Sequence, residues 1–371
     1  METPTLATTR LDNIAANLAA IRARVGDRLV LAAVKADAYG HGAVEVSRHL
    51  QRTGAADQLG VATVGEGVEL RRAGITLPIL KLSVARGPEV ATALEHSLEL
   101  VAVDDLSITE AGRAAAAAGH EAVMHLKVDT GMRRIGCEPG DAVRLARLAD
   151  ATPGVRLRGV MSHLPISDAA EGDAFTSAQV ALFGQVAAQV EADRGPVLKH
   201  LANSGGVLGH PSAWFDMVRP GVMVYGSYPD ADTPRTVDLL PALEWRSRVT
   251  FVKPVRAGET VGYGRTWTAP ADTWIATVAV GYGDGYSRSL SNRGRMLAAG
   301  RSYPIAGRVS MDQTMIDLGP DPVVGVGDEV VLLGRDGDLE ITAAELAGLQ
   351  GTISYEVTCA IARRVARSYL A

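Results

Sequence analysis

A lysine ends the first apolar run of the sequence. Lys35 follows the segment LVLAAV at residues 29–34. An ammonium group is costly to bury without a partner, and burial lowers the pKa of an amine, which then becomes a nucleophile able to form a Schiff base. Lys35 is therefore a candidate for covalent chemistry. An ion pair with a nearby carboxylate such as Asp37 would explain the same position.

Several later apolar runs also end in polar side chains. Lys127 and Asp129 follow one run, and Ser162 and His163 follow the next. The last two runs contain four further polar residues, His200, Asn203, Ser204 and Arg219. In parallel barrels the functional groups gather at the carboxyl ends of the strands, so these positions are candidates for an active site.

Two glycine-containing turns could hold a phosphate group. They are NSGG at 203–206 and RPGV at 219–222, where barrels commonly bind phosphate. Tyr39, four residues after Lys35, would lie on the same side of a helical turn and could hydrogen-bond the anion. Tight turns alone would explain the same glycines.

The elements that must position these groups alternate in type between residues 28 and 226. Short apolar runs without polar alternation are separated by segments with helical spacing, which is typical of strands buried on both faces of a parallel sheet. The eight runs predict an α/β chain with a (β/α)8 barrel. They are RLVLAAVKA, LGVATVG, PILKLS, LELVAVDD, AVMHLKVD, LRGVMSH, VLKHLANS and MVRPGVMVYG.

The pattern changes after about Pro234. Alternating strand-like runs separated by Gly and Pro turns predict a C-terminal all-β domain, with a helical pattern only at ITAAELAGL. We therefore expect a barrel over residues 11–234 and a β domain over 235–371. Residues 1–10 would form an N-terminal strand that packs with the β domain or stands alone.

Composition narrows the function classes. The chain has 371 residues, 37 Lys plus Arg, 42 Asp plus Glu and two cysteines. No block of like charges suggests nucleic acid as a partner, and residues 174–190, although uncharged, are too polar to cross a membrane. The eight histidines form no HExxH pair, so we expect no metal. With no apolar signal core at the N-terminus, we expect a soluble, cytoplasmic protein that acts on a small molecule.

A Schiff-base lysine combined with a phosphate cradle is typical of an enzyme that uses pyridoxal phosphate. AVKADAYGHG resembles the cofactor motif of the alanine racemases, the pyridoxal phosphate-dependent enzymes of the barrel-type fold III. The resemblance continues in the family's order, nearly to the end of the chain, through LKVDTGMRRIG, GVMSH, HLANSGG, DMVRPGVMVYG, VGYGRTW, GYGDGY, GRVSMDQ and TISYEV.

The resemblance implies a two-base racemase that interconverts L-alanine and D-alanine. Lys35 would carry the cofactor and serve one face of the substrate, and Tyr263 of the partner subunit would serve the other, in a homodimer with shared sites. Two opposed groups allow net inversion. A tyrosine hydroxyl ordinarily has a pKa near 10, so the resemblance also implies activation of Tyr263 through His163 and Arg219.

Arg219 resembles the family's partner of the pyridine nitrogen. A guanidinium stays protonated and would keep that nitrogen unprotonated, which limits side reactions. Related barrel-type decarboxylases have a carboxylate there, so Arg219 favours a racemase. A pyridoxal phosphate carrier without catalysis is a third alternative, which the full C-terminal domain with Tyr263 disfavours.

The remaining roles follow from the same resemblance. Arg134 and Met311 would meet the substrate carboxylate, and Lys127 resembles a lysine that is often carbamylated. The cofactor-binding set is Lys35, Tyr39, His163, Ser204, Arg219, Gly221, Val222 and Tyr355. The partner's entrance would be lined by Tyr282, Arg288, Ser310 and Asp312.

Three residues depart from the family pattern. Arg133 replaces a small or polar residue, Pro165 replaces alanine, and Gly205 lies in NSGG instead of a sequence like NSAA. Serine or a broader range of amino acids therefore stays open as substrate. The sequence also leaves open whether Lys127 is carbamylated and whether the enzyme serves D-alanine biosynthesis or alanine catabolism.

Overall fold

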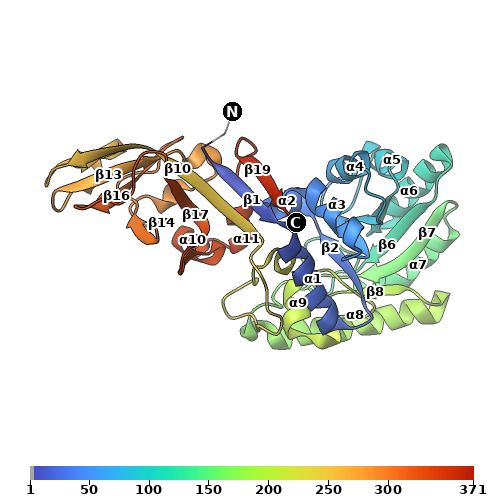
Figure 1. Cartoon of the computed structure of the whole chain (residues 1–371). Coiled ribbons are helices and arrows are strands. Elements are labelled where there is room, and N and C mark those ends of the chain that lie inside the picture. The colour runs from blue at the N-terminus through green and yellow to red at the C-terminus, as the bar shows by residue number, and fades with distance from the viewer. Residues whose placement is uncertain (1–3) are drawn as a thin grey trace. The chain divides into compact units, whose positions relative to one another are not determined.

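The computed structural model describes residues 4–371 and divides into two compact units (Figure 1). The barrel unit comprises residues 13–38 and 43–240. The β unit comprises the described residues up to 12, residues 39–42 and residues 241–371. Within the described residues, no helix is both long enough and apolar enough to cross a membrane.

Eight parallel strands close the barrel, so the predicted fold class is confirmed. Leu29 and Val30 of the first strand pair with Met217 and Val218 of the last, which closes the ring. The strands are β2 (Leu29–Ala33), β3 (Gln58–Val61), β4 (Ile79–Lys81), β5 (Leu98–Ala102), β6 (Ala122–Lys127), β7 (Val155–Met161), β8 (Leu198–His200) and β9 (Met217–Val218).

Apolar side chains fill much of the barrel interior. Leu31, Leu80, Val101, Met161 and Met217, from five different strands, form one buried cluster. Burial on both sides explains why these strands lack alternating polar residues. The interior is packed, and ligand chemistry is left to the ends of the strands.

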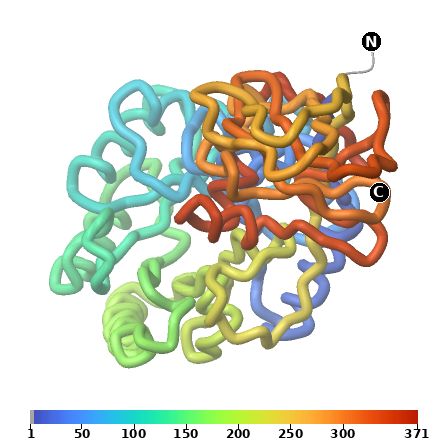
Figure 2. Tube along the Cα trace, turned by 90° about the vertical axis from the view of Figure 1, so that its left-hand side faces the viewer, coloured from blue at the N-terminus to red at the C-terminus, as the bar shows by residue number. Residues whose placement is uncertain are grey.

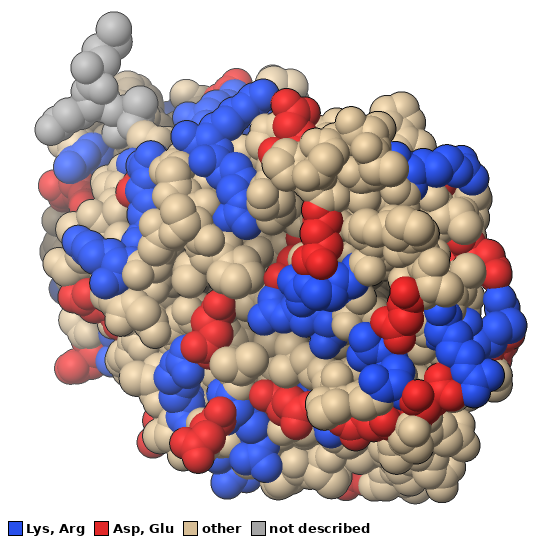
Figure 3. Space-filling model, turned by 90° about the vertical axis from the view of Figure 1, so that its right-hand side faces the viewer, with Lys and Arg blue, Asp and Glu red and all other residues tan. Residues whose placement is uncertain are grey.

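One helix precedes the first barrel strand, and the others connect successive strands of the barrel. They are α1 (Leu11–Val25), α2 (Lys35–Gly40), α3 (Ala43–Thr53), α4 (Val64–Arg72), α5 (Pro88–Glu95), α6 (Asp105–Ala118), α7 (Ala142–Ala151), α8 (Asp173–Arg194) and α9 (Ser204–Gly209). A capping box starts α4, in which Thr63 accepts from the Glu66 amide and Glu66 accepts from the Thr63 amide. On the face in Figure 3, basic and acidic side chains are interspersed.

The β unit is built around a nine-stranded sheet, traced mainly in orange and red in Figure 2. Its strands are β1 (Leu6–Arg10), β10 (Leu243–Val255), β13 (Thr273–Val278), β14 (Arg295–Ala298), β15 (Arg301–Pro304), β16 (Thr314–Gly319), β17 (Glu329–Asp336), β18 (Leu339–Ile341) and β19 (Ala366–Leu370). A separate hairpin joins β11 (Thr260–Val261) to β12 (Trp267–Thr268). Two short helices, α10 (Ala343–Gln350) and α11 (Ser354–Cys359), complete the unit.

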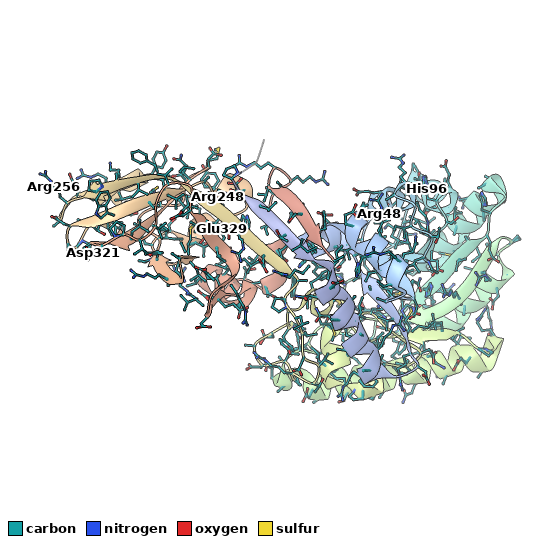
Figure 4. All side chains as sticks on the ribbon, in the orientation of Figure 1. Arg48, His96, Arg248, Arg256, Asp321 and Glu329 are labelled. Atoms are coloured by element: carbon teal, nitrogen blue, oxygen red, sulfur yellow. The ribbon has the colours of Figure 1, made fainter. Side chains whose placement is uncertain are left out.

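The first strand of the chain belongs to this sheet. Strand β1 pairs antiparallel with β10 and parallel with β19. Arg248 and Glu329, labelled in Figure 4, are register partners on β10 and β17. Trp245 and Tyr286 pack edge to face in the core, with ring centroids 5.7 Å apart. The sheet is therefore assembled from both ends of the chain.

Candidate active site

Lys35 begins α2, a turn that winds left-handed. Ala36, Asp37, Ala38 and Tyr39 have φ of 52°, 53°, 54° and 55°, and the Ala38 amide donates to the Val34 carbonyl at 2.9 Å. A left-handed helix brings each Cβ close to the next carbonyl oxygen, at a cost of roughly 1–2 kcal/mol per residue. The sequence predicts a helical turn here but gives no indication of its hand.

Hydrogen bonds to backbone groups fix the segment on either side of Lys35. The Tyr225 hydroxyl donates to the Ala33 carbonyl at 2.7 Å, and the Val34 amide donates to the Gly60 carbonyl at 2.8 Å. After the lysine, the Ala36 amide donates to Glu66 Oε1 at 2.7 Å. These contacts hold the strained turn in place.

Arg219 follows β9 and is held inside the barrel by neutral groups. Its Nη2 donates to the carbonyls of Ser162 and Leu201 at 2.6 and 3.0 Å. Nη1 lies 3.0 Å from His200 Nδ1, and Nη2 lies 3.4 Å from His163 Nδ1. Burial lowers the pKa of the Arg219 guanidinium to about 9, which still leaves it charged at neutral pH.

Lys127 belongs to a cluster of cations in the barrel unit. The pKa of Lys127 is lowered to about 8, first by burial and then by Arg219, Arg134 and Lys35. The pKa of His163 lies well below its ordinary value, because of burial and then the same cations together with Lys127. Lys35, Lys127, Arg134 and Arg219 therefore all lie close enough to His163 to lower the pKa of its imidazole, which stays neutral at pH 7. Such a cluster favours an anionic ligand.

Ser204 and Gly221 come together beside the last two strands. The Gly221 amide donates to Ser204 Oγ at 2.9 Å, and the Met223 amide is 3.5 Å from the same oxygen. Val222 is the next residue along the turn and begins a short 3₁₀ helix. The predicted phosphate-binding residues of the barrel unit, Ser204, Gly221 and Val222, therefore lie close together.

Tyr39 and Tyr355 lie together in the β unit. Their rings pack edge to face with centroids 6.2 Å apart. The pKa of Tyr39 is raised by burial and, to a smaller extent, by Cys359 and Tyr355. The Tyr39 hydroxyl therefore keeps its proton at neutral pH and can donate a hydrogen bond.

The residues predicted to reach the partner's site gather in one pocket of the β unit. This pocket has a volume of about 790 Å³. Tyr263 is 73% exposed, Met311 is 53% exposed, and the Tyr282 amide donates to the Ser310 carbonyl at 3.0 Å. The predicted residues that line it are Tyr263, Tyr282, Arg288, Ser310, Met311 and Asp312.

The three departures from the family pattern differ in their surroundings. Arg133 has a φ of 56°, and its exposed side chain forms an ion pair with Glu138 at 2.7 Å. Pro165 is exposed. Gly205 is buried, and a Cβ on it would lie 2.7 Å from backbone atoms of Ser167. Close packing therefore explains the glycine at 205.

Replacing Gly205 by alanine is expected to lower the free energy of unfolding by about 1–3 kcal/mol, because Ser167 must move. The matched control is Gly209→Ala in the same helix. A Cβ at Gly209 would meet its nearest atom, Pro234 Cγ, at an ordinary 3.6 Å. Thermal or urea unfolding of both variants measures the difference. Equal stability of the two would contradict the packing argument.

Sequence reasoning missed two buried polar residues inside strands. Glu99 lies in β5 and His125 in β6, and the His125 ring lies 3.0 Å from Glu99 Oε2 and 2.8 Å from His200 Nε2. Their signal in the sequence is a single titratable residue inside each apolar run. His200, predicted as a strand-end residue, links them to Arg219.

Comparison with known proteins identifies the family. The sequence-family model of the alanine racemase N-terminal domain matches residues 9–229. The sequence-family model of the alanine racemase C-terminal domain matches residues 242–369. The chain belongs to the alanine racemase family. The alanine racemase of Cutibacterium acnes is 52% identical over 99% of this chain and 98% of the relative. That of Symbiobacterium thermophilum is 44% identical over 99% and 97%.

Solved structures give the same family. The alanine racemase of Streptomyces lavendulae superposes with a TM-score of 0.93 at 38% identity, covering 100% of this chain and 98% of that chain. The alanine racemase of Clostridium difficile gives 0.94 at 34% identity, covering 100% and 96%. As a member of the alanine racemase family, the chain is an isomerase that acts on amino acids.

Proposed function

We propose that this enzyme interconverts L-alanine and D-alanine with pyridoxal phosphate and two opposed bases, Lys35 and Tyr263 of the partner subunit. The observation that carries the proposal is the cation cluster around His163 in the barrel unit, which includes Lys35 and the buried Arg219. A cofactor with a phosphate and a phenolic oxygen, together with a substrate carboxylate, would supply the anions that such a cluster favours.

The residues present fit this cofactor. Lys35 offers the amine, and the Ser204 hydroxyl and the Val222 amide offer donors for a phosphate. The Gly221 amide orients Ser204 by donating to its Oγ, and Tyr39 and Tyr355 extend this set by similarity to the family. Arg219 would face the pyridine nitrogen and Arg134 the substrate carboxylate. When bound, pyridoxal phosphate acidifies the Cα–H bond of the amino acid joined to it by accepting its electron pair.

The chain's own groups would move the protons. Lys35 Nζ exchanges a proton with the substrate α-carbon on one face, and Tyr263 Oη of the partner subunit does so on the other. The neutral imidazole of His163 lies 3.4 Å from Arg219. It would link the guanidinium to the hydroxyl of Tyr263 of the partner subunit by hydrogen bonds and so activate that hydroxyl. Because the two bases would belong to different subunits, each active site needs both subunits to hold a base on either face of the substrate.

The partner-side pocket supports a homodimer. Tyr263 and Met311 are large apolar side chains that are largely exposed in the single chain, as expected of residues that another subunit covers. Tyr282, Arg288, Ser310 and Asp312 would surround the entrance for the substrate. We propose a cytoplasmic location, as expected of a chain with only two cysteines.

Deuterium exchange tests the function directly. We expect L-alanine in D2O to gain deuterium at the α-carbon and to yield D-alanine, as chiral chromatography with mass spectrometry would show. Inversion of serine or larger amino acids as well would establish a broad racemase. Release of carbon dioxide, or no exchange in the presence of bound cofactor, would refute the proposal in favour of a decarboxylase or a carrier.

Dilution is expected to reduce activity per protomer. If Tyr263 acts in the partner's site, specific activity should fall in proportion to the dimer fraction once the protein is diluted below its dimer dissociation constant. Activity assays and sedimentation across one concentration series would measure both. A constant specific activity across dissociation would disprove the shared site.

Lys127 is expected to bind carbon dioxide as a carbamate. With a pKa of about 8, about one tenth of its amine is neutral at pH 7, and this fraction rises with pH. The negative carbamate would also offset the surrounding cations. NMR with ¹³C-bicarbonate should show a carbamate signal that grows from pH 7 to pH 8.5 at constant dissolved carbon dioxide. The signal should be absent in Lys127→Met, and its persistence there would reject the assignment.

A further inference from the structure

A path of buried polar side chains leads through the barrel interior to Arg219. His125 on β6 and His200 on β8 are both 0% exposed. His125 Nδ1 lies 2.8 Å from His200 Nε2, and His200 Nδ1 lies 3.0 Å from Arg219 Nη1. At the far end, His125 Nε2 lies 3.0 Å from Oε2 of Glu99 on β5. The four side chains form one continuous chain of hydrogen bonds.

Gly159 on the intervening strand β7 makes room for this path. It is the register partner of His125 on one side and of Leu198 on the other. A Cβ at Gly159 would lie 2.8 Å from His125 Nδ1 and 2.6 Å from the Leu198 carbonyl oxygen. Only a residue without a side chain lets the two imidazoles meet across β7.

Three donors hold the Glu99 carboxylate as an anion. Gln58 Nε2 donates to Oε2 at 2.6 Å, Arg158 Nη1 forms an ion pair with Oε1, and His125 donates to Oε2. Burial opposes ionisation, but the hydrogen bond from His125, followed by the charges and the Gln58 donor, brings the pKa of Glu99 below its ordinary value. An ionised carboxylate can only accept hydrogen bonds.

This anion fixes the direction of every hydrogen bond in the path. Because Glu99 only accepts, His125 must carry its proton on Nε2, and its Nδ1 is an acceptor when the ring is neutral. His200 then donates from Nε2 and accepts from Arg219 at Nδ1. Burial lowers the pKa of both imidazoles, in agreement with two neutral rings.

The path provides a hydrogen-bond acceptor that orients the Arg219 guanidinium. Among residues 4–371, no carboxylate forms an ion pair with the Arg219 guanidinium, whose partners are two carbonyls and two imidazoles. If His200 carried its proton on Nδ1 instead, two N–H groups would point at each other and push the guanidinium away. The orientation of Arg219 therefore depends on the tautomer of His200.

We propose that Glu99 and His125 are positioning residues that lock His200 as a hydrogen-bond acceptor and so hold Arg219 in its working orientation. The link to catalysis rests on the proposed function, in which Arg219 faces the pyridine nitrogen. The tautomer lock itself is independent of that function, because it concerns only hydrogen bonds within the barrel unit.

Long-range ¹H–¹⁵N NMR of the ¹⁵N-histidine-labelled full-length holoenzyme reads the tautomers directly. With eight histidines, signals can be assigned by replacing each in turn. We expect both His125 and His200 to be neutral with the proton on Nε2. A wild-type His200 with its proton on Nδ1 would overturn the proposal, whether or not any variant folds.

Glu99→Gln is the variant that should reverse the direction of the hydrogen bonds along the path. The new amide oxygen must face Arg158, so its NH2 group would point at Gln58 and His125. Gln58 Oε1 has no hydrogen-bond partner among the described residues, so this amide can turn over and accept. His125 would then receive a hydrogen bond at Nε2, and both histidines would move their protons to Nδ1.

The expected consequence is a fall in kcat of about tenfold or more with little change in KM, because Arg219 is displaced. Gln58→Met is the matched control. It removes a neighbouring donor but keeps the carboxylate, so both tautomers and kcat should stay within twofold of wild type even if stability falls. Retention of Nε2–H in Glu99→Gln, or reversed tautomers with unchanged kcat, would refute the proposed role. If wild type shows the expected tautomers but no racemisation, the proposed function fails while the lock stands.

Discussion

Lys35→Ala is expected to abolish racemisation, with a loss in kcat/KM of at least about 10,000-fold. The variant loses both the amine that would bond to the cofactor and the base for one face of the substrate. Chiral chromatography would measure the activity. Borohydride reduction followed by peptide mass spectrometry would show whether the cofactor is still linked covalently to the chain at residue 35.

Lys81→Met provides the control for loss of a buried lysine. Lys81 is 3% exposed at the end of β4, and its Nζ donates to the Val84 carbonyl at 2.7 Å and to Ser83 Oγ at 3.1 Å. We expect this variant to lose stability but to keep the cofactor on Lys35. A cofactor linked at another lysine in wild type, or turnover preserved in Lys35→Ala, would contradict the assignment.

Tyr263→Phe is expected to lower racemisation by about 100- to 10,000-fold while leaving the cofactor bound. With Lys35 intact, only one enantiomer of alanine should exchange its α-proton with D2O, and it should do so without inversion. Because Tyr263 is 73% exposed in the single chain, loss of its hydroxyl should barely affect the stability of a protomer. Mass spectrometry of each enantiomer after incubation in D2O measures this asymmetry.

Tyr282→Phe is the comparison within the same pocket. Tyr282 is 43% exposed and also lines this pocket, but its proposed place is at the entrance. We expect a loss of less than about tenfold, with exchange of both enantiomers retained. Inversion at the wild-type rate in Tyr263→Phe would exclude it as the second base.

The sequence predicts the barrel well because each strand has a strong local signal. All eight apolar runs contain the strands β2 to β9 wholly or in large part. Since parallel strands end at one side of a barrel, the order of the chain also predicts that Lys35, Lys127 and Arg219 meet. The lowered pKa of Lys127, to which Arg219 and Lys35 both contribute, agrees with this prediction.

Other features depend on neighbours that are distant in sequence. The residues of the left-handed turn, Ala36 to Tyr39, carry no glycine that would indicate a positive φ. Glu99 and His125 lie among apolar residues, and only the pairing of their strands, β5 and β6, shows that the two side chains are joined. Tertiary contacts override local preference at these positions.

The left-handed turn also limits how the enzyme could be redesigned. Each residue from Ala36 to Tyr39 opposes the backbone preference of L-amino acids, and a β-branched side chain there would add further strain. Directed evolution that samples Ala36, Asp37 and Ala38 should thus recover mainly small residues, glycine or asparagine. New substrate preferences would more readily arise from the loops after other strands, which leave the backbone at Lys35 untouched.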